Sequence, residues 1–182
     1  MKTFIASTVA VSAIASAASA DFTFSFTNQT WTGFNFSDVT LLAGGFTGTL
    51  TGVSVNATLN ASVAFTYADD LCVYVDVLPL GTGGLLQVGG FSNLSAAQRI
   101  SWANGASSVP GTTVIDSVSV NPISFGGIGQ PNIWVGNGYG AAGTSGTWTG
   151  SITLIGVNAV PAPGALALLG VAGLAAGRRR RA

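Results

Sequence analysis

Apolar and polar residues alternate along the middle of the chain, and the longest alternation covers residues 53–67. Every odd-numbered position in it is apolar or aromatic: Val53, Val55, Ala57, Leu59, Ala61, Val63, Phe65 and Tyr67. Successive side chains of a β-strand point to opposite faces, so this period of two predicts a strand with one buried face. At ~3.3 Å per residue the segment would extend for ~50 Å, and we therefore expect a bend or bulge near residues 57–60.

Shorter alternating segments predict strands on both sides of this one. Near the start, Phe22, Phe24 and Phe26 alternate with polar residues. Asp69-Asp70 is typical of a turn, and a strand is expected after it at 71–77. One face of this strand would hold Leu71, Val73, Val75 and Val77, and the other would hold Cys72, Tyr74 and Asp76.

The second half of the chain continues in the same way. Strands are expected at 85–88, at 114–120 where Pro122 would stop the strand, at 133–135, and around Trp148, which we expect in the core. Residues 92–105 alone have a helical pattern, with Ser92 or Asn93 as the N-cap. Short strands joined by Gly-rich connections predict an all-β fold, an antiparallel β-sandwich that is jelly-roll-like.

Both ends of the chain have the character of targeting segments. Residues 1–20 hold one cation, Lys2, then an apolar run and Ala18-Ser19-Ala20, which fits the small-residue rule for signal peptidase. The prediction is a secretory signal peptide, with Asp21 as the first mature residue. A β-sandwich domain is expected at 21–158, followed by a tail at 159–182.

Removing the two ends changes the apparent charge. The whole chain has six basic and six acidic residues, but Arg99 is the one basic residue in 21–163, where all six Asp lie, so this part carries a net charge of −5. Phosphate backbones are bound by basic surfaces, so nucleic acid is not expected as a partner. A region of this length suits one domain.

The tail combines a proline motif, an apolar run and an arginine cluster. Pro161 and Pro163 precede Gly164, the apolar run occupies 165–177, and Arg178, Arg179, Arg180 and Arg181 follow. The run is shorter than the ~20 residues of an ordinary membrane crossing, and the arginines would keep its end on the cytoplasmic side.

This order resembles the PEP-CTERM sorting signal of Gram-negative bacteria, with Ala162 in place of the glutamate. The resemblance implies that the hydrophobic helix holds the protein transiently in the inner membrane. It also implies cleavage near Pro161, Pro163 and Gly164 by an exosortase-like enzyme, and a product at the cell surface or in the extracellular matrix.

The body is similar, in the order of several short motifs, to the P domain that follows subtilisin-like proteases. The matching residues are Asp70-Leu71, Leu80-Gly81-Thr82, Asn137-Gly138 and Gly146-Thr147-Trp148-Thr149. This resemblance implies a jelly-roll-like sandwich.

Candidate chemistry is sparse. The chain has no histidine, so histidine-based catalytic triads and zinc sites are absent, and no enzymatic activity is expected. Cys72 is the one cysteine, and we expect a buried thiol. Calcium prefers carboxylate and carbonyl oxygens, which makes Asp69 and Asp70, with Asp38 or Asp116, a candidate calcium site.

Four aromatic residues in or near Gly-rich polar segments are candidates for stacking on a sugar: Trp31, Trp102, Trp134 and Tyr139. The predicted function is an exported cell-surface or extracellular-matrix protein, structural or adhesive and associated with biofilm exopolysaccharide. The first alternative is a carbohydrate- or calcium-binding module. The second is a glycosidase that uses two carboxylates such as Asp69 and Asp76.

Overall fold

The computed structural model describes residues 21–76, 83–126 and 130–160. The predicted signal peptide with Ala18 and Ala20, the Leu80-Gly81-Thr82 motif, and the tail with its prolines and arginines lie outside the described residues. The elements, in chain order, are β1 (Phe22–Thr32), β2 (Phe36–Asp38), α1 (Val39–Ala43), β3 (Phe46–Val63), the 3₁₀ turn η1 (Ala68–Asp70), β4 (Leu71–Asp76), β5 (Leu86–Val88), β6 (Gln98–Ile100), β7 (Thr113–Phe125), β8 (Asn132–Asn137) and β9 (Ser145–Ala159).

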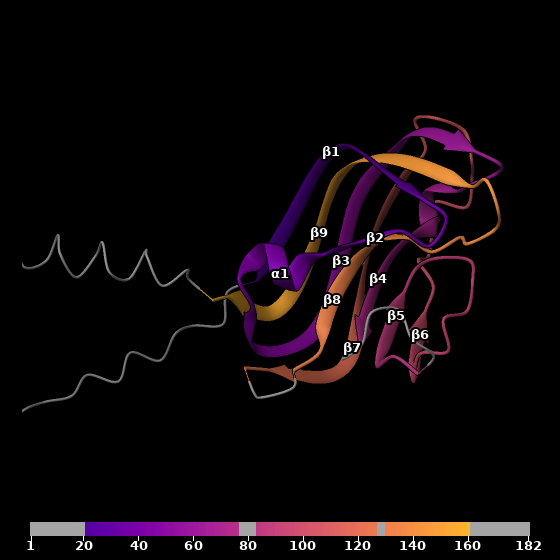
Figure 1. Ribbon diagram of the computed structural model, residues 1–182. Coiled ribbons are helices and arrows are strands. Elements are labelled where there is room, and N and C mark those ends of the chain that lie inside the picture. Colours follow the sequence, from indigo (N-terminus) through magenta and orange to yellow (C-terminus); the bar gives the residue numbers. More distant parts are fainter. Residues whose placement is uncertain (1–20, 77–82, 127–129, 161–182) are drawn as a thin grey trace, which may run out of the picture.

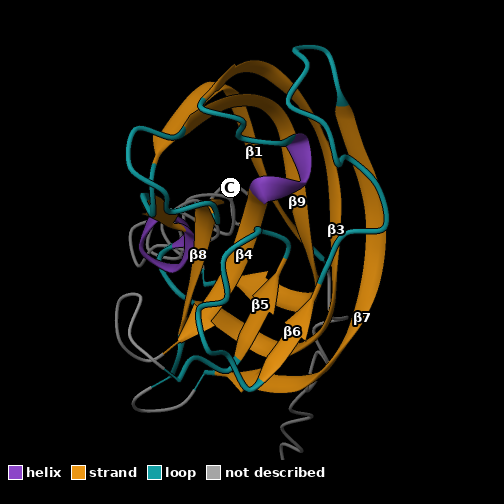
Figure 2. Ribbon diagram, turned by 90° about the vertical axis from the view of Figure 1, so that its right-hand side faces the viewer, coloured by secondary structure: helices purple, strands orange, loops and turns teal. Residues whose placement is uncertain are grey.

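These strands form two sheets that pack face to face (Figures 1 and 2). One sheet has four strands in the order β1-β9-β3-β7, and the other has five in the order β2-β8-β4-β5-β6. Neighbouring strands are antiparallel except β5 and β6, which are parallel. The predicted β-sandwich is therefore confirmed.

The core lies between the two sheets. From β3 it receives Val53, Val55, Ala57 and Leu59, which confirms the buried face expected for the first half of the long alternation. Trp148 of β9 is also fully buried, as predicted, and its ring lies 5.9 Å from that of Trp31 between centroids. In β4 both faces are buried, and Cys72 is a buried free thiol as expected.

The expected bulge in the long strand is present. The pairing of β3 with β9 shifts between Leu59 and Ala61, so Asn60 is the extra residue. One inserted residue reverses the face on which every later side chain lies. The prediction that Ala61, Val63, Phe65 and Tyr67 face the core is therefore wrong. Ala61 and Val63 are exposed on β3, and Phe65 and Tyr67 are exposed beyond it.

Two further predictions are corrected by pairing between distant segments. The helix expected at 92–105 is not formed, because Gln98–Ile100 pairs with β5 as β6 and Ser95 has a φ of 59°, outside the helical region. Pro122 does not stop β7, which continues to Phe125. Strand β7 is at a sheet edge and its pairing with β3 shifts between residues 119 and 123, so a residue without an N–H is tolerated there.

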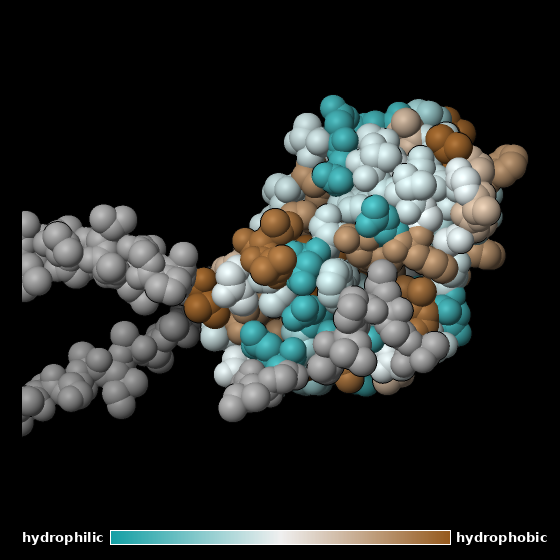
Figure 3. Space-filling view, in the orientation of Figure 1, coloured by the Kyte–Doolittle hydropathy of each residue, from teal (hydrophilic) through white to brown (hydrophobic). Residues whose placement is uncertain are grey.

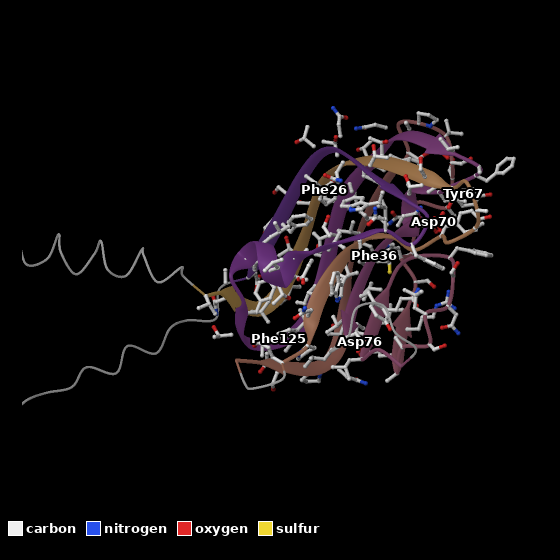
Figure 4. The ribbon with its side chains drawn as sticks, viewed as in Figure 1. Phe26, Phe36, Tyr67, Asp70, Asp76 and Phe125 are labelled. Atoms are coloured by element: carbon white, nitrogen blue, oxygen red, sulfur yellow. The ribbon has the colours of Figure 1, made fainter. Side chains whose placement is uncertain are left out.

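The sandwich has two distinct ends, joined by the fifteen residues of β9, or ~50 Å of strand. At one end the backbone N–H of Gly156 donates to Asp21 Oδ1 at 3.0 Å, and the N–H of Val160 donates to the carbonyl of Gly45 at 3.0 Å. The first and last described residues thus lie there, beside α1 (Figure 1), while Asp70 of η1 lies at the opposite end (Figure 4). In the three described ranges no helix is long and apolar enough to cross a membrane.

Candidate functional site

A cleft made of two adjoining hollows opens at the η1 end of the sandwich. The first hollow has a volume of about 200 Å³ and is lined by Phe65, Tyr67, Asp70, Phe91 and Tyr139. The second has a volume of about 330 Å³ and is lined by Tyr67, Asp69, Asp70, Gly89, Gly90, Phe91, Arg99, Ser101 and Trp102. Because the two hollows share three residues, we treat them as one site, the terminal cleft. Tyr67 and Asp70 mark its position in Figure 4.

Phe65 reaches the cleft from a strained turn. Ala64 and Phe65 have φ values of 52° and 60°, and the N–H of Thr66 donates to the carbonyl of Val63 at 3.4 Å, which is the signature of a two-residue type I′ turn. Such turns favour Asn-Gly, because a residue with a Cβ loses roughly 1–2 kcal/mol in this conformation. The Phe65 side chain is 77% exposed, so burial in the sandwich does not offset this strain.

Phe91 lies on a loop whose backbone packs closely against the backbone near Gly138. Gly89 and Gly90 precede it with φ values of 73° and 78°. A Cβ at Gly90 would lie 2.8 Å from the Cα of Gly138, so a larger residue would displace the loop. The Arg99 Nη2 donates to the Phe91 carbonyl at 2.8 Å. The Phe91 ring is 74% exposed and packs against Tyr139, with the centroids 5.5 Å apart and the planes at 81°.

Asp70 connects the segment that contains Phe65 and Tyr67 to the loop that contains Phe91. Its Oδ2 accepts the backbone N–H of Tyr67 at 2.7 Å, and its Oδ1 accepts that of Phe91 at 3.1 Å. The carboxyl is buried, and this burial raises the pKa of Asp70 to about 6. The neighbouring Asp69 carboxylate also raises it, while the two N–H donors oppose the shift. Asp70 is therefore both a structural clamp and a charge at the base of the cleft.

Of the carboxylates proposed as calcium ligands, Asp69 and Asp70 line the cleft together, whereas Asp38 and Asp116 do not line it. Burial raises the pKa of Asp69, which lines the cleft beside Asp70. Asp38 instead caps α1 by accepting the N–H of Leu41 at 2.9 Å, and Asp116 accepts the N–H of Ala103 at 2.7 Å. Among the described residues no group of three or more His, Cys, Asp or Glu side chains is placed to hold a metal ion.

The carboxylates considered for a glycosidase are also far apart. Asp70 precedes β4 and Asp76 is its last residue, which separates them by ~20 Å of extended strand. A glycosidase pair needs about 5–9.5 Å, so Asp76 does not form such a pair with the carboxylates of the cleft.

The four aromatic residues proposed for sugar stacking have different positions. Trp31 is buried in the core and its Nε1 donates to Ser37 Oγ at 3.1 Å, so it is not available for stacking. Trp102 is also buried, with Nε1 donating to the Leu71 carbonyl at 2.7 Å, although its edge lines the second hollow. Trp134 is half-buried in β8 and does not line the cleft. Tyr139 is a wall of the first hollow.

Three aromatic residues of the cleft were not predicted as site residues: Phe65, Tyr67 and Phe91. Arg99 and Ser101 of the second hollow were not predicted either. Phe65 and Tyr67 appeared to belong to the buried face of the long alternation. A signal for Phe91 was available, since an aromatic residue directly follows Gly89-Gly90 in a polar segment. Figure 3 shows hydrophobic side chains protruding at the cleft end of the molecule.

Comparison with known proteins gives no further assignment. A scan against family models, a search of curated proteins and a search of solved structures each found no match. The resemblances to the PEP-CTERM signal and to the P domain therefore stay predictions from the sequence motifs.

Proposed function

We propose that this protein is exported to the cell surface or extracellular matrix and adheres there to a carbohydrate polymer through the terminal cleft. The observation that supports this proposal is the group of exposed aromatic rings around a buried carboxylate. Binding sites for organic ligands combine apolar and aromatic walls with a few polar groups that fix orientation. In the terminal cleft the polar groups are Asp69, Asp70, Arg99 and Ser101, which offer both acceptors and donors to sugar hydroxyls.

The position of the cleft suits a protein that is held by its tail. In this proposal signal peptidase removes residues 1–20, and an exosortase-like enzyme acts on the tail at 159–182 while it lies in the inner membrane. The described chain begins and ends at the α1 end, and the cleft lies at the other end of β9. A polymer would therefore reach the cleft both before and after the tail is processed. Within this proposal the sandwich is jelly-roll-like and its partner is an exopolysaccharide.

The proposal is tested by affinity electrophoresis of the purified protein through gels that contain polysaccharide extracted from the producing cells. Phe91→Ala and Phe65→Ala remove exposed rings from the cleft, and we expect both variants to migrate with much less retardation than the wild type. Ile115→Ala is the matched control, because Ile115 is an exposed apolar residue on β7 that does not line the cleft. Equal retardation of all four proteins would contradict a role for the cleft.

A further inference from the structure

The first hollow of the terminal cleft has room for one functional group rather than a whole ligand. Its volume of about 200 Å³ is below the ~300 Å³ at which sites for complete small molecules begin. Four of its five lining residues are aromatic, and the fifth is Asp70. The chemistry of this hollow is therefore that of aromatic faces combined with one carboxylate.

The geometry of the rings suits a positive charge. Phe91 and Tyr139 stand at 81° to one another with centroids 5.5 Å apart, so the edge of one ring meets the face of the other in the lining of the hollow. The face of an aromatic ring carries negative potential, and a cation within about 6 Å of several ring centroids is attracted by all of them. Phe65 and Tyr67, which follow β3 in the chain, complete the lining of the hollow.

The charges around the hollow favour the same sign. Asp69 and Asp70 lie side by side at the base of the cleft, in a region with a net charge of −5 over 21–163. Arg99, the one basic residue of that region, lines the second hollow but not the first, and its Nη2 is bonded to the Phe91 carbonyl. The field in the first hollow therefore attracts cations and repels anions.

We propose that the first hollow binds an ammonium group, so that the ligand of the terminal cleft is a glycan with positively charged amino substituents. This inference rests on the proposed function, because it specifies the class of polymer bound at the same site. The ammonium group contacts the faces of the aromatic rings and pairs with Asp70, while the sugar ring that carries it extends toward the second hollow. Neutral glycans lack the charge for which the first hollow is built, and polyuronates carry the opposite charge.

Two oligosaccharides of equal length separate charge from sugar structure. One is an N,N,N-trimethylated glucosamine oligomer, whose positive charge does not depend on pH, and the other is the neutral N-acetylated oligomer. Isothermal titration calorimetry at pH 7.5 and low salt would compare their binding to the wild type, Phe91→Ala, Asp70→Asn and Asp38→Asn. The last variant removes an equal charge at the α1 end, where asparagine replaces aspartate as an N-cap of similar strength.

We expect the wild type and Asp38→Asn to bind the trimethylated oligomer at least tenfold more tightly than the N-acetylated oligomer. We also expect Phe91→Ala and Asp70→Asn to lose this preference. Phe91 is mostly exposed, so its truncation leaves the fold and the net charge unchanged and isolates the contribution of the ring.

Three results would overturn the inference. Equal or tighter binding of the N-acetylated oligomer would show that the cleft binds sugars without a cation, and the proposed function would survive. A preference for the trimethylated oligomer that persists in Phe91→Ala and Asp70→Asn would show attraction by the overall negative charge. Binding of neither oligomer would remove the ammonium site, and the retardation experiment would then decide separately whether the cleft binds polysaccharide.

Discussion

Replacing Asp70 with asparagine should remove most of the pH dependence of stability that we expect for this protein between pH 4 and 7. Burial raises the pKa of Asp70 from 3.8 in the unfolded chain to about 6 in the folded protein. The folded state therefore holds a proton that the unfolded state has already released. By linkage, the free energy of unfolding is highest below pH 3.8 and falls as the pH rises toward 6.

The magnitude follows from the same pKa values. At 1.36 kcal/mol for each pH unit the full shift corresponds to about 3 kcal/mol, and solvent that reaches the carboxylate through the cleft reduces this to ~1–2 kcal/mol. In asparagine the amide oxygen accepts one of the two N–H groups and the NH2 faces the other, which costs ~1–3 kcal/mol at every pH. The effect of the charge therefore appears in the slope: between pH 4 and pH 7 the wild type should lose ~1–2 kcal/mol more stability than Asp70→Asn.

Urea unfolding of the wild type and Asp70→Asn at half-unit intervals from pH 4 to 7.5 would measure this difference. Asp38→Asn controls for the loss of one negative charge and should retain the wild-type slope that Asp70 causes. A small slope should remain in Asp70→Asn, because burial also raises the pKa of Asp69. A wild type that becomes more stable as the pH rises from 4 to 7, by an increase that Asp70→Asn lacks, would refute this reasoning, since the Asp70 anion would then be favoured by its two hydrogen bonds.

Four other predictions address the turn, the core, the thiol and the processing. Phe65→Gly should raise the free energy of unfolding in urea titration by up to about 1 kcal/mol, because glycine adopts the positive φ without strain. A loss of stability would contradict the strain argument. The same variant should be retarded less in polysaccharide gels. Trp148→Phe should lower the free energy of unfolding by ~2–4 kcal/mol, because it leaves a cavity and removes the buried hydrogen bond that Nε1 donates to the Ala68 carbonyl at 3.2 Å; a change below 1 kcal/mol would count against this packing. Burial raises the pKa of the Cys72 thiol, so a thiol reagent should label the protein only in denaturant, and rapid labelling of the native protein would place the thiol at the surface. Intact mass of protein from the culture medium should fit residues 21 to about 163, whereas a mass that includes Arg178–Arg181 would disprove the processing proposal.

The parts of the fold that the sequence predicted depend on short-range periodicity. The alternation through Val53, Val55, Ala57 and Leu59 identified a buried strand face, because a local pattern determines which side chains share a side. The position of Trp148 in the core was predicted in the same way. The bulge was expected from strand length, but its effect on Phe65 was not, since a single unpaired residue is not visible in an apolar–polar pattern.

The features that were missed depend on partners far away in the chain. The segment at 92–105 has a helical pattern. However, the N–H of Gly89 donates to the Ile100 carbonyl and the N–H of Gln98 donates to the Leu85 carbonyl, and this pairing with β5 overrides the local preference. The candidate site shows the same limit. Tyr139 and the Asp69-Asp70 pair were predicted as site residues from the sequence. Their position beside Phe91 in one cleft depends on how three loops pack together, which the sequence pattern does not show.

At the terminal cleft the sequence departs from several local rules of folding. Ala64 and Phe65 occupy turn positions that favour asparagine and glycine, Phe65 and Phe91 are left largely exposed, and Asp70 carries a buried carboxyl. Each feature alone lowers stability, and each has an ordinary replacement that would remove the penalty. Exposed apolar side chains also occur elsewhere, as at Leu41 and Leu42 of α1, and Asn28 and Ser95 also have a positive φ. At the cleft, however, a strained turn, two exposed phenylalanine rings and a buried carboxyl lie together. Such a combination is expected where selection acts on binding as well as on stability, and it is the physical reason for proposing that this end of the molecule binds a ligand.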